Sequence, residues 1–454
     1  MEAIQTGGDL KVGIGYKQII SIALPITIAI VIPQVNLLIN SIFLGHFDET
    51  ALGNAGITGV YYLIFAVAGN GLNNALQTVF SRFAGSGDLN MFKYVLAQGF
   101  RISLTFALCC IAFTWFIAPL ILKQVANESA FPVEMQFLRI RIWGLPFLYI
   151  FQMCNALLVA SLNSRLLMIG FIVEAVVNVF FDYGFIFGNF GLPALGFDGA
   201  AYASILAEIA GMVTVLLVLN YAGLKKRFQL FSSFKYNKQI SNAILKVSVP
   251  LVSQYIMSVT TWLIFFLLIE TKGDQAKAIS NVMRNVYGLA GIFVWALAGT
   301  SNAMVSNLMG QQRQHDVFKL MKRISLLSFT WCLVICFLLN FFPAHFFNLF
   351  GQDRSFVEAG IPVIRMVSLG MLLLGLASPW LNAVTGTGRT KVNLIIEIVA
   401  ILLYLIYTWY FMVLDYRSLS LAWSNEFIYW TSILLISYFY MRSGKWKTSR
   451  ILGE

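Results

Sequence analysis

The chain carries an internal repeat, and both copies of it are strongly apolar. Ala-Leu-Pro at residues 23–25 begins one apolar stretch, and Ser-Val-Pro at 248–250 begins another. A polar segment follows in each copy, Arg-Phe-Ala-Gly-Ser-Gly-Asp at 82–88 and Asn-Leu-Met-Gly-Gln-Gln-Arg at 307–313. Pro25 and Pro250 are 225 residues apart, and so are Gly85 and Gly310. Duplicated helix bundles are typical of transporters in which one half moves against the other, so the repeat indicates transport.

The composition predicts that both copies lie in a membrane. Of the 454 residues, 59% are hydrophobic and 11% are charged, whereas soluble domains carry about 25% charged residues. Mean hydropathy is +0.77. Apolar runs as long as the ~20 residues that a helix needs to cross the hydrocarbon core fill the chain. We therefore predict an all-α integral membrane protein with twelve transmembrane helices in two pseudo-symmetric six-helix lobes.

The apolar runs also predict where the spans and domains lie. The predicted spans are 18–44, 53–80, 95–121, 135–160, 166–188, 197–221, 241–269, 277–306, 318–343, 358–384, 391–413 and 418–441. The predicted domains are an N-terminal six-helix lobe (1–221), a cytoplasmic inter-lobe linker (222–240), a C-terminal six-helix lobe (241–441) and a basic cytoplasmic tail (442–454).

The distribution of charge predicts the orientation. With both termini in the cytoplasm, most of the 31 basic residues fall in inner loops, as the positive-inside rule requires. The net charge of +11 is spread over these loops, so it does not indicate nucleic-acid binding. The N-terminus lacks a short apolar region with a cleavage site, so we interpret residues 18–44 as a membrane helix and not as a signal peptide. We expect a multi-pass protein of the cell (inner) membrane.

Metal sites and membrane enzymes are not indicated. The five cysteines all lie in apolar runs and form neither a zinc pattern nor a disulfide framework. The three histidines, His46, His315 and His345, are scattered, whereas a membrane enzyme needs clustered acidic or histidine side chains. We therefore expect no enzyme activity, no metal and no cofactor other than a coupling ion.

Polar residues in the first copy recur at helical spacing. Glu174, Asn178 and Asp182 are four residues apart and therefore share one helix face. At 1.5 Å per residue, Asp182 lies about 25 Å along its helix from the inner loop. Further amides in apolar runs are Asn36, Asn40 and Asn155. A carboxyl group away from water and among amides is a candidate for binding and releasing a proton. The alternative is that the amides only hold helices together.

The second copy has a different set of polar residues. Its first helix carries Gln254 and Ser258, and the next carries Arg284. For Arg284 we weigh pairing with Glu270 or Asp274 against contact with anionic cargo. Glu397 lies inside an apolar run, and the nearest cations in the sequence, Arg389 and Lys391, are its expected partners. Two more acidic residues occur in apolar runs. These are Glu208, which we expect to face a neighbouring helix, and Glu426.

The motifs together resemble the multidrug and toxic compound extrusion (MATE) family over nearly the whole chain. The resemblance rests on Ala-Leu-Pro, on Gly-Leu-Asn-Asn-Ala-Leu-Gln-Thr with Arg-Phe-Ala-Gly-Ser-Gly-Asp (71–88), and on Asn-Ala-Val-Thr-Gly-Thr-Gly-Arg-Thr (382–390). The most specific part is Asn178-x-x-x-Asp182-Tyr-Gly-Phe-Ile-Phe-Gly followed by Gly199-Ala-Ala-Tyr-Ala. It implies a monomer with two lobes around a central cavity that exports small organic, often cationic, compounds in exchange for H⁺ or Na⁺.

Two positions depart from the family pattern. Asn40 and Ser258 stand where many members have acids. Asp182 and Asn178 match, so we assign cation coupling to Asp182, Asn178, Asn40, Asn155 and Glu174. For the substrate cavity we propose Asn36, Gln254, Ser258, Arg284 and Glu397. The alternative is a flippase for lipid-linked oligosaccharide or precursor, from the same superfamily. It would need a basic cavity, for which Arg284 and Arg101 are the only candidates in the sequence.

Overall fold

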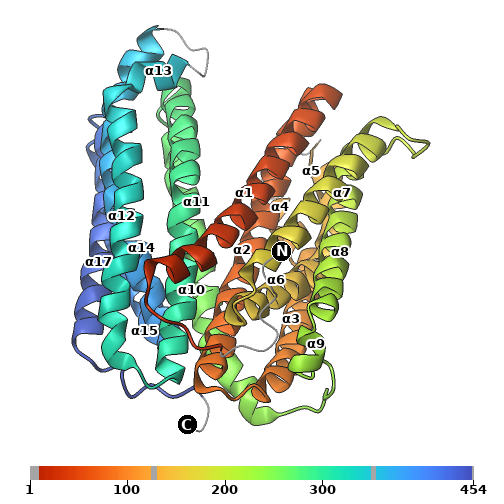
Figure 1. Cartoon of the computed structure of the whole chain (residues 1–454). Coiled ribbons are helices and arrows are strands. Elements are labelled where there is room, and N and C mark those ends of the chain that lie inside the picture. The colour runs from red at the N-terminus through yellow and green to blue at the C-terminus, as the bar shows by residue number, and fades with distance from the viewer. Residues whose placement is uncertain (1–9, 124–129, 349–353, 452–454) are drawn as a thin grey trace. The chain divides into compact units, whose positions relative to one another are not determined.

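The computed structural model of the protein (Figure 1) describes residues 10–123, 130–348 and 354–451. In these ranges all regular structure is helical, which confirms the all-α prediction. The helices are α1 (Tyr16–Phe47), α2 (Glu49–Ser86), α3 (Met91–Phe116), α4 (Ala118–Leu122), α5 (Phe131–Arg141), α6 (Leu145–Ala160), α7 (Leu167–Phe187), α8 (Phe197–Tyr221), α9 (Leu224–Arg227), α10 (Lys238–Glu270), α11 (Asp274–Gly310), α12 (Val317–Phe341), α13 (Pro343–Asn348), α14 (Arg354–Gly386), α15 (Thr390–Trp409), α16 (Leu419–Trp423) and α17 (Asn425–Arg442). Short helical segments of other types are η1 (Ile142–Gly144), η2 (Ser164–Leu166), η3 (Gln314–Asp316) and η4 (Tyr410–Leu414).

Within the described residues, 11 helices are long and apolar enough to cross a membrane. They include every predicted span except the last, 418–441. That region is also helical, but α17 has 18 residues that begin with Asn425 and Glu426 and end at Arg442. These polar ends lower its hydropathy and explain why it stands apart from the other eleven.

The chain divides into two compact units whose boundaries fall inside α1 and α10. The first unit is built chiefly from Ile28–Val252, and the second from Lys11–Thr27 and Ser253–Glu454. Both boundaries lie two residues beyond a proline, Pro25 or Pro250. Proline removes a backbone hydrogen bond from a helix and permits a bend, so the two halves of each helix can belong to different units. The units thus differ from the predicted domains in where residues 11–27 and 222–252 are placed.

Each unit packs its helices in the same pairs. In the first unit, α6 contacts α2, α3 and α8, and α7 contacts α8. In the second unit, α14 contacts α11, α12 and α17, and α15 contacts α17. The two sets correspond helix by helix along the repeat. The duplicated sequence therefore folds into two bundles with the same internal arrangement.

The segment before the first helix of each copy is held by a residue at the same place in the repeat. In the first unit, Gln98 Nε2 donates to the carbonyl of Lys235, at 2.8 Å. In the second unit, Arg323 Nη1 donates to the carbonyl of Ile14, at 2.5 Å. Gln98 and Arg323 are 225 residues apart, like Pro25 and Pro250. Equivalent positions of the repeat therefore make equivalent hydrogen bonds in the two units.

Candidate functional site

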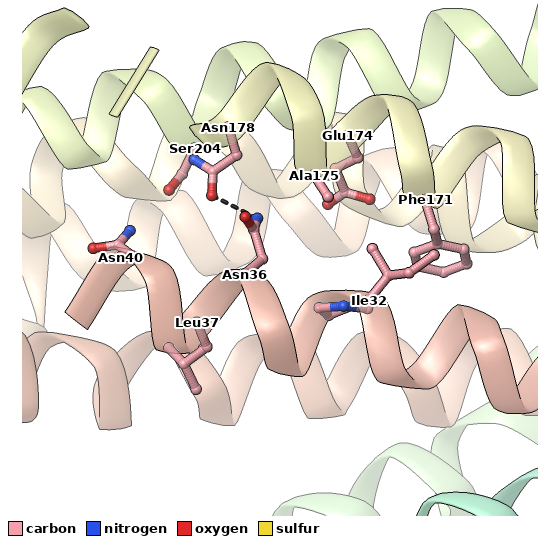
Figure 2. Close-up of a pocket in the computed structure, with 10 residues that line it drawn as sticks. Ile32, Asn36, Leu37, Asn40, Phe171, Glu174, Ala175, Asn178 and Ser204 are labelled. Atoms are coloured by element: carbon pink, nitrogen blue, oxygen red, sulfur yellow. Dashed lines mark hydrogen bonds between the residues drawn. The ribbon is translucent and has the colours of Figure 1, made fainter. Parts of the chain in front are cut away.

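A small pocket lies between α1 and α7 in the first unit (Figure 2). Its volume is about 160 Å³. Asn36 Nδ2 donates to Asn178 Oδ1 across it, at 2.6 Å. Asn40, Glu174 and Ser204 also line it. Of the residues assigned to cation coupling, three therefore share one pocket, together with Asn36, which was assigned to the cargo.

Asp182 lies one turn beyond this pocket on the same face of α7. Its side chain is fully buried, and within the described part of the chain neither carboxylate oxygen has a hydrogen-bond partner. Asn178, one turn away, is also buried, and its Nδ2 group is unpaired. Helix α7 ends five residues later, where Gly188 adopts a φ of 76° and its N–H bonds to the carbonyl of Gly184. A buried carboxyl without partners is a place where a small cation or proton can be taken up.

Asn155 is the one residue assigned to cation coupling that lies on neither α1 nor α7. It lies on α6, is buried, and its Oδ1 has no partner among the described residues. It does not line the pocket between α1 and α7. Its assignment to cation coupling stays a prediction.

A buried ion pair that the sequence did not predict lies beside α7. Arg141 Nη2 bonds to Glu208 Oε1 at 2.6 Å, and Nη1 bonds to Oε2 at 3.0 Å. Tyr62 donates to the same Oε1 at 2.8 Å, and its ring lies 3.7 Å below the guanidinium. The Arg141 side chain is 12% exposed. Glu208 faces a neighbouring helix as expected, and there it meets a bidentate cation.

The ion pair reaches the acidic face of α7 through α8. Gly211, one turn from Glu208 on α8, packs against Glu174, and a Cβ atom there would lie 3.3 Å from the Glu174 Cβ. The ion pair of Arg141 and Glu208 therefore lies one turn along α8 from the point where α8 packs against half-buried Glu174.

In the second unit, Glu397 lies in a network of neutral donors. Gln254 Nε2 donates to Oε2 at 3.2 Å, and Tyr429 donates to Oε1 at 2.5 Å. Ser258 is hydrogen-bonded to Tyr429 at 3.1 Å. The structure thus brings together Gln254, Ser258 and Glu397. The expected pairing of Glu397 with Arg389 or Lys391 is wrong, because those side chains are exposed while Glu397 is fully buried.

Asn393, which was missed in the sequence, and Glu426, which was noted there without a partner, complete the polar groups of this unit. Asn393 donates to Gln254 Oε1 at 2.6 Å, one turn before Glu397 on α15. Glu426 Oε2 accepts from Tyr287 at 3.1 Å and from Trp430 at 2.8 Å. The only signal for them was a polar side chain in an apolar run. Their partners lie on other helices and could not be read from spacing.

Arg284 forms an ion pair with neither Glu270 nor Asp274, the two partners considered from the sequence. Glu270 bonds to Lys277 at 2.7 Å, and no ion pair of Arg284 occurs in the described ranges. Its exposed guanidinium lies 6.0 Å from the ring of Phe266. The described residues also contain no group of three or more His, Cys, Asp or Glu side chains that could hold a metal ion.

Comparisons with known proteins connect these features to a family. A family model described as MatE matches residues 25–184 and 250–410, so its two matches begin at the corresponding prolines. A Thermotoga maritima protein named probable multidrug resistance protein NorM is 24% identical over 448 residues, which is 96% of this chain and 94% of that protein.

Solved structures show the same fold. One is an outward-facing conformation of a multidrug resistance MATE family transporter of the MOP superfamily, with a TM-score of 0.84 and 16% identity over 100% of this chain and 99% of that one. Another is a MOP superfamily transporter from Pyrococcus furiosus, described as having a binding pocket of reverse polarity that suggests a different function. It has a TM-score of 0.82 and 16% identity over 99% of both chains. These likenesses confirm the predicted fold of two six-helix lobes.

Proposed function

This chain belongs to the MatE family, and on that premise we propose that it is a secondary active antiporter exporting small organic compounds in exchange for H⁺ or Na⁺. Members of this family are transporters and not enzymes. The match to a probable multidrug resistance protein over 94% of its length supports drug-like cargo. The eleven apolar helices and the basic loops support a multi-pass protein of the cell membrane with both termini in the cytoplasm. We propose that it works as a monomer.

The buried, unpartnered carboxyl of Asp182 is the observation that carries the coupling proposal. When it holds a proton it is neutral and needs little solvation. When it loses the proton it needs donors such as the free Nδ2 group of Asn178. A proton shifts the balance between two conformations only by its differential affinity for them. A difference of one pKa unit between the conformations is worth about 1.36 kcal/mol, which biases them tenfold.

The cargo needs a larger space than the pocket beside Asp182. Pockets for drug-sized ligands measure about 300–1,000 Å³, whereas this one holds about 160 Å³. We therefore assign the pocket to the coupling ion. Half-buried Asn36 and Ser258 and exposed Arg284 are accessible cargo contacts, whereas Gln254 and Glu397 are buried and become accessible only if the hydrogen bond between them opens.

Transport in vesicles tests the coupling. The protein is reconstituted into liposomes, and efflux of the organic cation ethidium is followed under an imposed proton gradient or an imposed Na⁺ gradient. Asp182→Asn should lower proton-driven efflux to the rate of protein-free vesicles while the protein still folds. Asp415→Asn is the matched control, because Asp415 lies in a loop and bonds to Arg417. Wild-type rates in Asp182→Asn would overturn the assignment, and efflux driven by Na⁺ alone would identify Na⁺ as the ion.

The exposed guanidinium of Arg284 supports the flippase as a second candidate. A cation that is free of ion pairs and lies over an aromatic ring can bind an anionic head group. The same vesicles, loaded with a fluorescent lipid carrying a diphosphate-linked sugar, distinguish the two functions. Movement of this lipid without efflux of ethidium would favour the flippase. Efflux of ethidium alone excludes it.

A further inference from the structure

A continuous chain of polar side chains crosses three helices of the second unit. Ser258 on α10 is hydrogen-bonded to Tyr429 on α17, and Tyr429 is hydrogen-bonded to Glu397 on α15. Gln254, one turn before Ser258, bonds to the other carboxylate oxygen. Glu397 is fully buried. Ser258 and Tyr429 are half-buried, so the network leads from two partly accessible hydroxyl groups to one buried carboxyl group.

No cation accompanies this carboxyl group in the part of the chain that the structure describes. The hydrogen-bond donors around Glu397 are an amide and a phenol, and none of the ion pairs in the described ranges includes it. The other titratable groups nearby are Glu426 on α17 and Tyr404 on α15, whose ring lies 5.8 Å from that of Tyr429. An ionised carboxylate is costly in such surroundings, and uptake of a proton removes that cost.

The hydrogen bonds of the network remain satisfied in both protonation states. With Glu397 ionised, Tyr429 donates to it, and Ser258 can donate to Tyr429. With Glu397 protonated, both bonds can reverse, since either atom of the Ser258–Tyr429 pair can be the donor. The buried Oδ1 of Asn393, beside Gln254, is a further acceptor without a partner among the described residues. A proton can thus enter or leave without moving a side chain.

We propose that Glu397 is a proton-binding site of the second unit, separate from Asp182 in the first unit. Each carboxylate oxygen accepts one hydrogen bond, which leaves a lone pair on each oxygen where a proton can bind. The reaction is the addition of H⁺ to the carboxylate and its later release. The existence of the site does not depend on the proposed antiport. Its role in coupling does rest on the proposed antiport, because two protons would then be bound per transport cycle.

Infrared difference spectroscopy tests the site directly. Detergent-purified protein is taken from acid to alkaline pH, and the carbonyl stretch of protonated carboxyl groups is followed. Glu397→Gln should remove one component of the lost band, and that component should persist in Asp182→Asn. Tyr429→Phe should shift its frequency, because the protonated group loses a hydrogen-bond partner. Glu270→Gln is the matched control, since Glu270 is exposed and paired with Lys277.

The possible results distinguish a failure of the Glu397 site from a failure of the proposed antiport. A Glu397→Gln spectrum identical to that of the wild type, in protein whose circular dichroism is unchanged, would overturn the proposal. So would loss of the component on adding Na⁺ at constant pH, or its loss in Glu426→Gln alone. If the component is present but Asp182→Asn still exports ethidium, the coupling role of Asp182 fails while the Glu397 site stands. The pH gradient that just balances an opposing cargo gradient gives the stoichiometry, which should fall from two protons to one in Glu397→Gln.

Discussion

In each copy of the repeat, a tyrosine at the same position donates a hydrogen bond to a buried carboxylate, but the other side chains that contact this carboxylate differ. Tyr62 and Tyr287 are 225 residues apart, and each donates a hydrogen bond to an acid on the last long helix of its unit. In the first copy this acid is Glu208, and it also receives two bonds from Arg141. In the second it is Glu426, whose other donor is Trp430. The scaffold is repeated, but its charges are not.

The copies also differ in the position along the helix at which a hydrogen bond joins the first and fifth helices. Asn36 and Asn178 join α1 to α7, whereas Gln254 and Glu397 join α10 to α15. The repeat position of Asn178 in α15 is Leu403, so Glu397 lies about 9 Å closer to the start of its helix at 1.5 Å per residue. Divergence has thus placed a polar bridge at a different depth in each unit.

Among the substitutions that test this difference between the copies, the removal of Arg141 should lower the unfolding free energy most. Arg141→Met leaves Glu208 buried without its cation, which costs about 3–5 kcal/mol of folding free energy. The unfolding free energy in detergent, measured with a chemical denaturant, should fall accordingly. The double variant Arg141→Met with Glu208→Gln should recover most of the loss, because no unpaired charge remains.

Arg139→Met is the matched control for this experiment. Arg139 is exposed, lies 5.1 Å from the ring of Trp115, and should contribute little. Equal losses in the two single variants would show that the ion pair does not distinguish the copies.

Closing the space over the ion pair should have the next largest effect. A Cβ atom at Gly144 would overlap Glu208 and lie 2.5 Å from Arg141 Nη1. Gly144→Ala should therefore lower the unfolding free energy by about 1–3 kcal/mol. In the second copy, Gly370 packs against Glu426, but an added Cβ atom there would lie 3.5 Å from the Glu426 Cβ, which is an ordinary contact.

Gly288→Ala is the control for the glycine substitution. Gly288 lies within α11 and has no atom within 4 Å of an added Cβ. Alanine should raise stability there by about 0.5–1 kcal/mol, because glycine is unfavourable inside a helix. A loss at both positions would mean that the backbone, and not the ion pair, requires glycine at position 144.

The sequence predicts which side chains share a helix face, because that depends on spacing alone. Glu174, Asn178 and Asp182 follow the helical period, and all three lie on the face of α7 that the structure buries or turns to the pocket. The two prolines of the repeat also mark where α1 and α10 pass from one unit to the other, although the predicted domains were not divided there. These features are local or repeated, so a single chain reveals them.

Partners across helices could not be predicted in this way. Arg141 and Glu208 are 67 residues apart, and Gln254 and Glu397 are 143 apart. Arg139 and Arg141 lie about 200° apart around a helix of 3.6 residues per turn, and spacing does not show which of them turns inward. Proximity in the sequence favoured Arg389 and Lys391 for Glu397, but tertiary packing placed amides and a tyrosine there.

The smallest expected effects come from the paired tyrosines, and they compare the copies most directly. Tyr287→Phe removes one of the two donors to Glu426, so it should cost about 1–2 kcal/mol. Tyr62→Phe should cost less than about 1 kcal/mol, because Glu208 keeps both bonds from Arg141 and the ring still lies under the guanidinium. The same chemical change at matched positions, measured by unfolding in detergent, thus isolates the contribution of the cation. In the Arg141→Met background the protection should vanish, and Tyr62→Phe should then cost at least as much as Tyr287→Phe does in the wild type. Equal costs at both tyrosines in the wild type would mean that Arg141 and Trp430 stabilise their carboxylates equally well. The two copies would then differ in charge but not in stability.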